Sequence, residues 1–177
     1  MQTKYFVIIL IASLFWGCNE EPIEPTDQSL YGLINHYRQE QDLSSVPYSV
    51  SLSIVAETHI DDLIQHYTIN DDCNLHSWSE NGNWSACCYT SDHEQAECMW
   101  SKPGELTSYE GAGYEIVAYK SSGITAKKAL ELWKKSEGHN SVISNLGKWA
   151  EIEWKAMGTA IRDDYAVVWF GEEKDPE

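Results

Sequence analysis

Two segments in the first third of the chain space their apolar residues as an amphipathic helix does. The shorter segment places four such residues at i, i+3, i+4 and i+7, namely Leu30, Leu33, Ile34 and Tyr37. The longer segment keeps helical spacing over three turns between residues 52 and 63. His59 falls on the apolar face of this second helix, so we expect a hydrogen-bonded core histidine rather than a ligand.

The second half of the chain combines one further helix with β patterns. Residues 114–119 are apolar on both faces except at Glu115, which is typical of a central strand covered from both sides. A third helix is expected after residue 125, with Gly138 as its left-handed end and His139 directly after it. Residues 157–162 and 165–171 alternate and predict a hairpin. This order of helices and strands predicts an α+β protein or a three-layer α-β-α sandwich.

The first residues of the chain predict export. An apolar run from residue 6 to residue 16 is shorter than the stretch of about 20 residues that crosses a bilayer, so residues 1–17 are interpreted as a secretory signal peptide. The pair Gly17-Cys18 resembles the bacterial lipoprotein box, in which Cys18 would be lipidated and become the mature N-terminus. Ordinary cleavage nearby is the alternative. Residues 18–27 would then form an acidic tether, and residues 172–177 form an acidic tail.

The chain has five cysteines, and four remain when Cys18 is set aside. In an exported protein an even set predicts two disulfides, here among Cys73, Cys87, Cys88 and Cys98. A bond between the vicinal cysteines would strain the peptide between them, so Cys73 is expected to pair with one of them and Cys98 with the other. The sequence leaves both of these pairings open. A zinc site is the alternative, but the C-x₂-C spacing of such sites is missing.

Charge and composition narrow the classes of function. The 177 residues include 28 acidic and 12 basic side chains, a formal net charge of −16, which repels nucleic-acid phosphates and excludes nucleic-acid binding. The length suits one domain, placed at residues 28–171. Within it, residues 70–103 show no sustained period and are rich in Cys and Trp, and long ordered loops of this kind usually carry function.

Three polar side chains stand in surroundings that do not suit idle solvated groups: His76, Glu115 and His139. A carboxylate inside an apolar strand needs a hydrogen-bond donor, and an imidazole N–H is a natural one. A carboxylate that accepts this hydrogen bond also fixes the tautomer of the imidazole ring. Two histidines and one glutamate could form a zinc site with an open position. Each also has a plainer interpretation: His76 precedes a capping box, His139 could bind helix carbonyls, and Glu115 could lie on an edge strand.

The order of these residues with their neighbours resembles the CAP superfamily of cysteine-rich secretory proteins, antigen 5 and pathogenesis-related 1 proteins. The motifs are Asn74-Leu75-His76-Ser77, Gly113-Tyr114-Glu115-Ile116, Ser136-Glu137-Gly138-His139-Asn140 and the two final strands. The resemblance spans about residues 28–171. It implies a three-layer α-β-α sandwich with a mostly antiparallel central sheet. It also implies a cleft lined by two His and one or two Glu, which binds a divalent metal in some members.

The resemblance assigns roles position by position. His76 matches the first cleft histidine, and Glu115 matches the glutamate of the family's Gly-Glu-Asn motif, although Tyr114 and Ile116 depart from it. His139 matches the histidine of the Ser-Pro-Gly-His-Arg motif in bacterial members. At the fourth cleft position, a glutamate in plant members, this chain has Ser136, and whether it or Glu137 replaces that carboxylate is left open.

Motifs for other chemistry are missing, since the chain has no G-x-S-x-G, H-E-x-x-H, P-loop or Rossmann fingerprint. The leading expectation is a non-catalytic, lipid-anchored binding module on the outer side of a bacterial membrane. Its cleft would hold zinc or another divalent cation, and family members have been associated with lipids and sterols, so a hydrophobic or glycan ligand is expected. A metal-dependent hydrolase with Glu115 as base, and a structural or adhesive surface protein, are the alternatives.

The tryptophans of the Cys- and Trp-rich residues 70–103, called the insertion below, allow two interpretations. Trp78, Trp84 and Trp100 could form the ligand contact surface, because indole rings bury a large area and carry one polar handle. They could equally form the miniature core of the insertion.

Overall fold

A three-stranded antiparallel sheet lies at the centre of the computed structural model, which describes residues 29–68 and 72–176. The strands are β1 (Gly113–Tyr119), β2 (Ala156–Arg162) and β3 (Tyr165–Gly171), in the order β1-β3-β2. The predicted hairpin is confirmed as β2 and β3, which pair from Ala156 opposite Gly171 to Arg162 opposite Tyr165. The predicted signal peptide, Cys18 and the predicted acidic tether lie outside the described residues.

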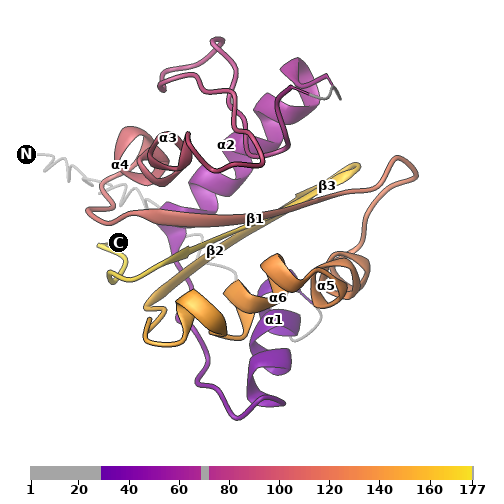
Figure 1. Ribbon diagram of the computed structural model, residues 1–177, viewed down its shortest axis with the longest axis vertical. Helices are drawn as coiled ribbons and strands as arrows, with labels where there is room; N and C mark the ends of the chain where they lie inside the picture. The colour runs from indigo at the N-terminus through magenta and orange to yellow at the C-terminus, as the bar shows by residue number, and fades with distance from the viewer. Residues whose placement is uncertain (1–28, 69–71, 177) are drawn as a thin grey trace, which may run out of the picture.

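Helices cover both faces of this sheet, so the predicted α-β-α sandwich is confirmed (Figure 1). One face carries α2 (Val50–His66), α3 (Ala96–Trp100) and α4 (Lys102–Leu106) together with the Cys-rich insertion. The other face carries α1 (Leu30–Gln39), α5 (Ala126–Lys135), α6 (Glu137–Ile143) and the 3₁₀ helix η1 (Gly147–Trp149). No helix in the described ranges is long and apolar enough to cross a bilayer.

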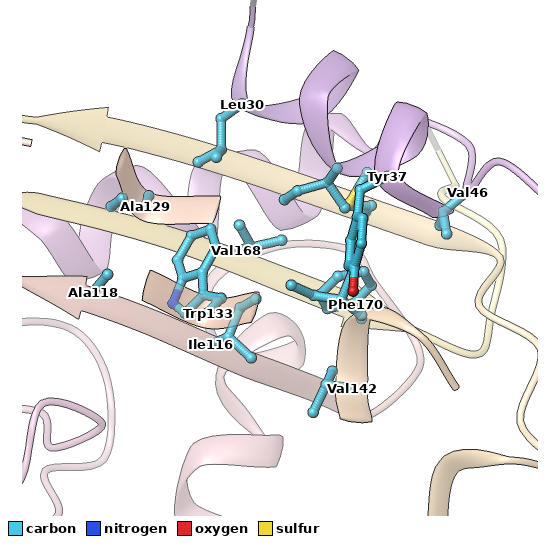
Figure 2. Packing of buried hydrophobic residues seen from close by; sticks show 14 of the residues in the cluster. Leu30, Tyr37, Val46, Ile116, Ala118, Ala129, Trp133, Val142, Val168 and Phe170 are labelled. Carbon is cyan, nitrogen blue, oxygen red and sulfur yellow. The ribbon is translucent and has the colours of Figure 1, made fainter. Parts of the chain in front are cut away.

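The alternation of β3 divides the core into two clusters. Val168 and Phe170 point to the α1 and α5 face, where they pack with residues such as Trp133 (Figure 2). Val167 and Trp169 point to the α2 face. Every residue of β3 is buried because the strand is central in the sheet and helices cover both of its faces.

The close packing of α2 on the sheet depends on a glycine. A Cβ added to Gly158 of β2 would lie 2.1 Å from the backbone carbon of Leu52 in α2. Only a residue without a side chain therefore lets helix and strand approach this closely. The start of α2 is fixed by Ser49, whose hydroxyl accepts a hydrogen bond from the backbone N–H of Leu52.

Two disulfides close the insertion, which confirms that the vicinal cysteines bond to different partners. Cys73 is bonded to Cys88, and Cys87 is bonded to Cys98. This is one of the two pairings that the sequence left open. An isolated bridge between Trp78 and Cys87 adds backbone pairing inside this loop.

Two details of the sequence interpretation are wrong. Helix α5 ends at Lys135 because Ser136 adopts an extended backbone conformation, and α6 begins at the next residue. Gly138 therefore lies within the first turn of α6 rather than ending a helix, and His139 lies on α6 itself. Strand β1 is covered on both faces as expected, but it pairs only with β3 and forms an edge of the described sheet.

Candidate functional site

Glu115 forms the centre of a buried polar cluster. Its side chain on β1 is 0% exposed and points to the sheet face that carries α2 and the insertion. Oε1 accepts a hydrogen bond from Nδ1 of His59, and Oε2 accepts one from Nδ1 of His76 at 2.7 Å. The carboxylate thus has an imidazole donor on each oxygen, as its burial requires.

His59 approaches Glu115 from α2 and is fully buried. Its second ring nitrogen, Nε2, lies 3.0 Å from the carbonyl oxygen of Ser77, and the ring stacks on Trp78 with centroids 4.2 Å apart. Both nitrogens face acceptors, so geometry assigns both of them a proton. Burial opposes the charged ring, yet the charge and hydrogen bond of Glu115 prevail and raise the pKa of His59 above its ordinary value.

The two histidines in turn shift the pKa of the Glu115 carboxylate. Burial alone would raise the pKa of Glu115, but the charges and hydrogen bonds of His59 and His76 lower it to about 2. Glu115 is therefore ionised throughout the physiological range. An ionised carboxylate that accepts hydrogen bonds on both oxygens is a poor general base, because its affinity for a further proton is low.

His76 lies at the boundary between this cluster and solvent, with its side chain 18% exposed. Its backbone N–H donates to the side chain of Asn74 at 2.9 Å, which fixes the turn that carries the ring. Because Nδ1 donates to Glu115, Nε2 is left as the acceptor available to a ligand or a metal ion. Glu115 thus sets the tautomer of His76.

His139 lies across from His76, with ring centroids 6.4 Å apart. Burial, together with the neighbouring His76, lowers the pKa of His139 to about 4. The ring is therefore neutral at pH 7 and presents one donor and one acceptor. The structure thus brings together all three residues predicted from the sequence, His76, Glu115 and His139.

The side chains at this site offer few donors to a divalent cation. Glu115 stands behind His76, bonded to Nδ1, whereas a metal ion held by His76 would bind Nε2 on the far side of the ring. Within residues 29–68 and 72–176, no group of three or more His, Cys, Asp or Glu is arranged to hold a metal ion. Two imidazoles remain, fewer than the three or four protein ligands usual for zinc. The predicted cation is therefore compatible only with a weak two-histidine site.

A cavity of about 230 Å³ opens at these histidines. Aromatic side chains form much of its wall: Tyr89, Trp100, Tyr114 and Trp149. Ser136, at the position of the family's fourth carboxylate, lines the cavity, whereas Glu137 is exposed and is not among the lining residues.

The three tryptophans of the insertion separate in the structure. Trp100 lines the cavity and its ring lies 5.8 Å from that of Tyr114. Trp78 is only 2% exposed and packs between His59, Trp84 and Trp169 in the core. Trp84 contacts Trp78 edge-on and belongs to the same packed cluster. Of the three, only Trp100 is placed to contact a ligand in this cavity.

The sequence analysis missed a polar pair in the cavity wall. The hydroxyl of Tyr89 and Nδ1 of His93 lie 2.9 Å apart, and both residues line the cavity. They come from the aperiodic insertion, where no hydrophobic pattern indicates which side chains face inward. The pairing of His59 with Glu115 was also missed, although the position of His59 on an apolar helix face pointed to burial beside a polar partner.

Comparison with known proteins identifies the family. Residues 31–157 match the model of the cysteine-rich secretory protein family, CAP. No curated protein sequence matches the chain.

Similar solved structures include proteins from three bacteria. An outer surface protein from Borrelia burgdorferi shares 19% identity over 82% of this chain and 90% of its own, with a TM-score of 0.55. An extracellular protein containing a SCP domain from Bacillus anthracis shares 17% identity over 81% of this chain and 39% of its own, with a TM-score of 0.53. A cysteine-rich secretory protein from Staphylococcus aureus shares 18% identity over 88% and 42%, also with a TM-score of 0.53. At these identities the matches establish the fold.

Proposed function

Because the chain belongs to the CAP family of cysteine-rich secretory proteins, we propose that it is an extracytoplasmic binding module whose cleft takes a small hydrophobic or glycan ligand. One observation carries this proposal. Both oxygens of the only carboxylate among the described cavity-lining residues are bonded to histidines, so Glu115 orients His76 and is not free to act as a base. This favours binding over hydrolysis.

The walls of the cavity support this ligand class. Trp100, Tyr114 and Trp149 offer aromatic faces that pack on apolar surface, including the apolar face of a sugar ring. His76 and His139 contribute a few polar atoms among them. A mostly apolar cavity with a small number of convergent polar groups is the usual form of a small-molecule site.

Ligand binding can be tested with a glycan array and a fatty-acid panel. We expect Trp100→Ala to abolish binding of any ligand found, while Ile64→Ala, an exposed apolar residue on α2 outside the cleft, leaves it unchanged. Equal binding by both variants would place the ligand elsewhere and reject the cleft as its site.

An extracytoplasmic location is supported by two independent facts. The two disulfides of the insertion persist in oxidising compartments. Two structural relatives are described as an outer surface protein and an extracellular protein. We further propose attachment to a bacterial membrane through a lipid on Cys18. Incorporation of labelled fatty acid should be lost in Cys18→Ala, and label that persists in this variant would refute the anchor.

The proposed divalent cation would bind His76 Nε2 and His139 and leave coordination positions open for a ligand oxygen. Zinc calorimetry tests this point. Binding should disappear in His76→Ala and in His139→Ala but persist in His36→Ala, because His36 is an exposed histidine on α1, with its side chain 70% exposed. No heat of binding with the parent protein would reject the cation and leave the cleft as a purely organic site.

A further inference from the structure

A second site is suggested by Arg38, which lies on α1 and is only 4% exposed. Its guanidinium donates from Nε to the carbonyl oxygen of Ser44 at 3.0 Å. It also donates from Nη1 to the carbonyl oxygen of Ile143 and to Oδ1 of Asn145, each at 2.6 Å. All three acceptors are neutral. Among the described residues, no carboxylate forms an ion pair with Arg38.

A buried guanidinium without a counter-ion is costly, because burial removes solvation that neutral acceptors replace only in part. Burial accordingly lowers the pKa of Arg38. Its Nη2 makes no hydrogen bond within the described ranges, and it is not among their fully buried polar atoms that lack a partner. Nη2 is therefore reachable from outside and retains two N–H donors.

Arg38 lines a cavity of about 740 Å³ that shares no lining residue with the histidine cleft. Lys155 and Lys174 add two further cations, and Tyr48, Ile152 and Trp154 add apolar surface. Two acids, Glu153 and Asp175, also line it.

Of these two acids, Asp175 already accepts hydrogen bonds from the protein. The carboxylate of Asp175 accepts hydrogen bonds from Ser49 and from the hydroxyl and backbone N–H of Ser51 at the start of α2. Three cations therefore face two acids here, one of which is already held by hydrogen bonds. Although the chain has a net charge of −16, the charges that line this cavity favour an anion.

We propose that this cavity binds an organic carboxylate, which accepts hydrogen bonds from Nη2 of Arg38 while its apolar part packs on Tyr48, Ile152 and Trp154. Lys155 and Lys174 hold the carboxylate electrostatically from the rim. A carboxylate suits the site because charge-assisted hydrogen bonds to guanidinium are strong, and the apolar wall favours an organic acid over a bare inorganic anion.

The test titrates the purified protein with sodium benzoate and follows backbone amide shifts by NMR. Benzamide is the matched control, since it has the same shape without the charge. We expect saturable shifts at Tyr48, Ile152 and Lys155 with benzoate, and binding of benzamide roughly tenfold weaker or worse. The absence of saturable shifts, equal affinity for both compounds, or shifts confined to the cleft around His139 would overturn the proposal.

Substitutions that remove charges test which side chains bind the carboxylate. Arg38→Gln should abolish benzoate binding in a protein that still folds. If this variant does not fold, Lys155→Gln combined with Lys174→Gln carries the test, with an expected loss of affinity of about three- to tenfold. The control is Lys127→Gln with Lys135→Gln, two exposed lysines on α5. Equal affinity in the two lysine double variants would contradict the site.

Discussion

Removing the Glu115 carboxylate should destabilise the protein strongly. Glu115→Ala removes the counter-ion of the fully buried His59 ring, which must then lose its proton or stay charged without a partner, and it also removes the acceptor of His76. Breaking a buried ion pair on one side costs about 3–5 kcal/mol. That is a large part of the roughly 5–15 kcal/mol that stabilises a typical domain. Each kcal/mol lowers the melting temperature of a domain of this size by about 2–4 °C.

The assay is urea unfolding with both disulfides intact, followed by circular dichroism. Glu57→Gln is the matched control, because Glu57 is an exposed glutamate on α2, and it should change stability by less than about 0.5 kcal/mol. A double-mutant cycle with His59→Asn isolates the coupling of the buried pair. A free energy of unfolding for Glu115→Ala within about 1 kcal/mol of the parent would refute the charged pair.

Two further predictions follow from the pKa of a histidine and from the packing of α2. Because the pKa of His139 is lowered to about 4, the unfolded chain binds a proton there before the folded one. The contribution of the neutral His139 ring to the free energy of unfolding is complete above about pH 6.5. As pH falls to about 4, up to about 3 kcal/mol of it is lost. His139→Asn should therefore make the urea midpoint less dependent on pH over this window. A slope equal to that of the parent would contradict the burial of this ring. His59 acts in the opposite sense, since stability that rests on its raised pKa is lost as pH rises through that value. Gly158→Ala should lower the melting temperature sharply because its Cβ would meet the backbone of α2, whereas Gly138→Ala, with open space around its Cβ, should raise stability by about 0.5–1 kcal/mol. Equal melting temperatures for the two alanine variants would show that α2 does not pack as described.

Much of the fold follows from local patterns in the sequence. The strands 157–162 and 165–171 alternate strongly, and the structure places β2 and β3 at nearly the same bounds. The end of α5 was misplaced for a physical reason. The residues from 134 to 137 are all polar, so the hydrophobic period carries no signal there, and the extended conformation of Ser136 ends the helix before the glycine is reached.

The site was predictable in part. A carboxylate inside an apolar strand requires donors, and this reasoning anticipated an imidazole beside Glu115. It did not identify His59, because Ile116 and Val117 are both apolar and alternation along β1 does not reveal which face Glu115 shares. That face is set by the packing of α2 and the insertion, which are remote in sequence. The sequence did not predict Tyr89 and His93 as cavity residues for a similar reason, since their loop is held by disulfides and has no hydrophobic period.

The central claim is that Glu115 joins two histidines and thereby turns the acceptor atom of His76 toward the cleft. Long-range ¹H–¹⁵N spectra of the histidine side chains test it most directly. In the parent protein they should show a proton on each nitrogen of His59 and a proton on Nδ1 of His76. In Glu115→Gln the amide group should donate to His76, and the proton of that ring should move to Nε2. A parent protein with the His76 proton already on Nε2, or with a singly protonated His59 ring at neutral pH, would contradict the account.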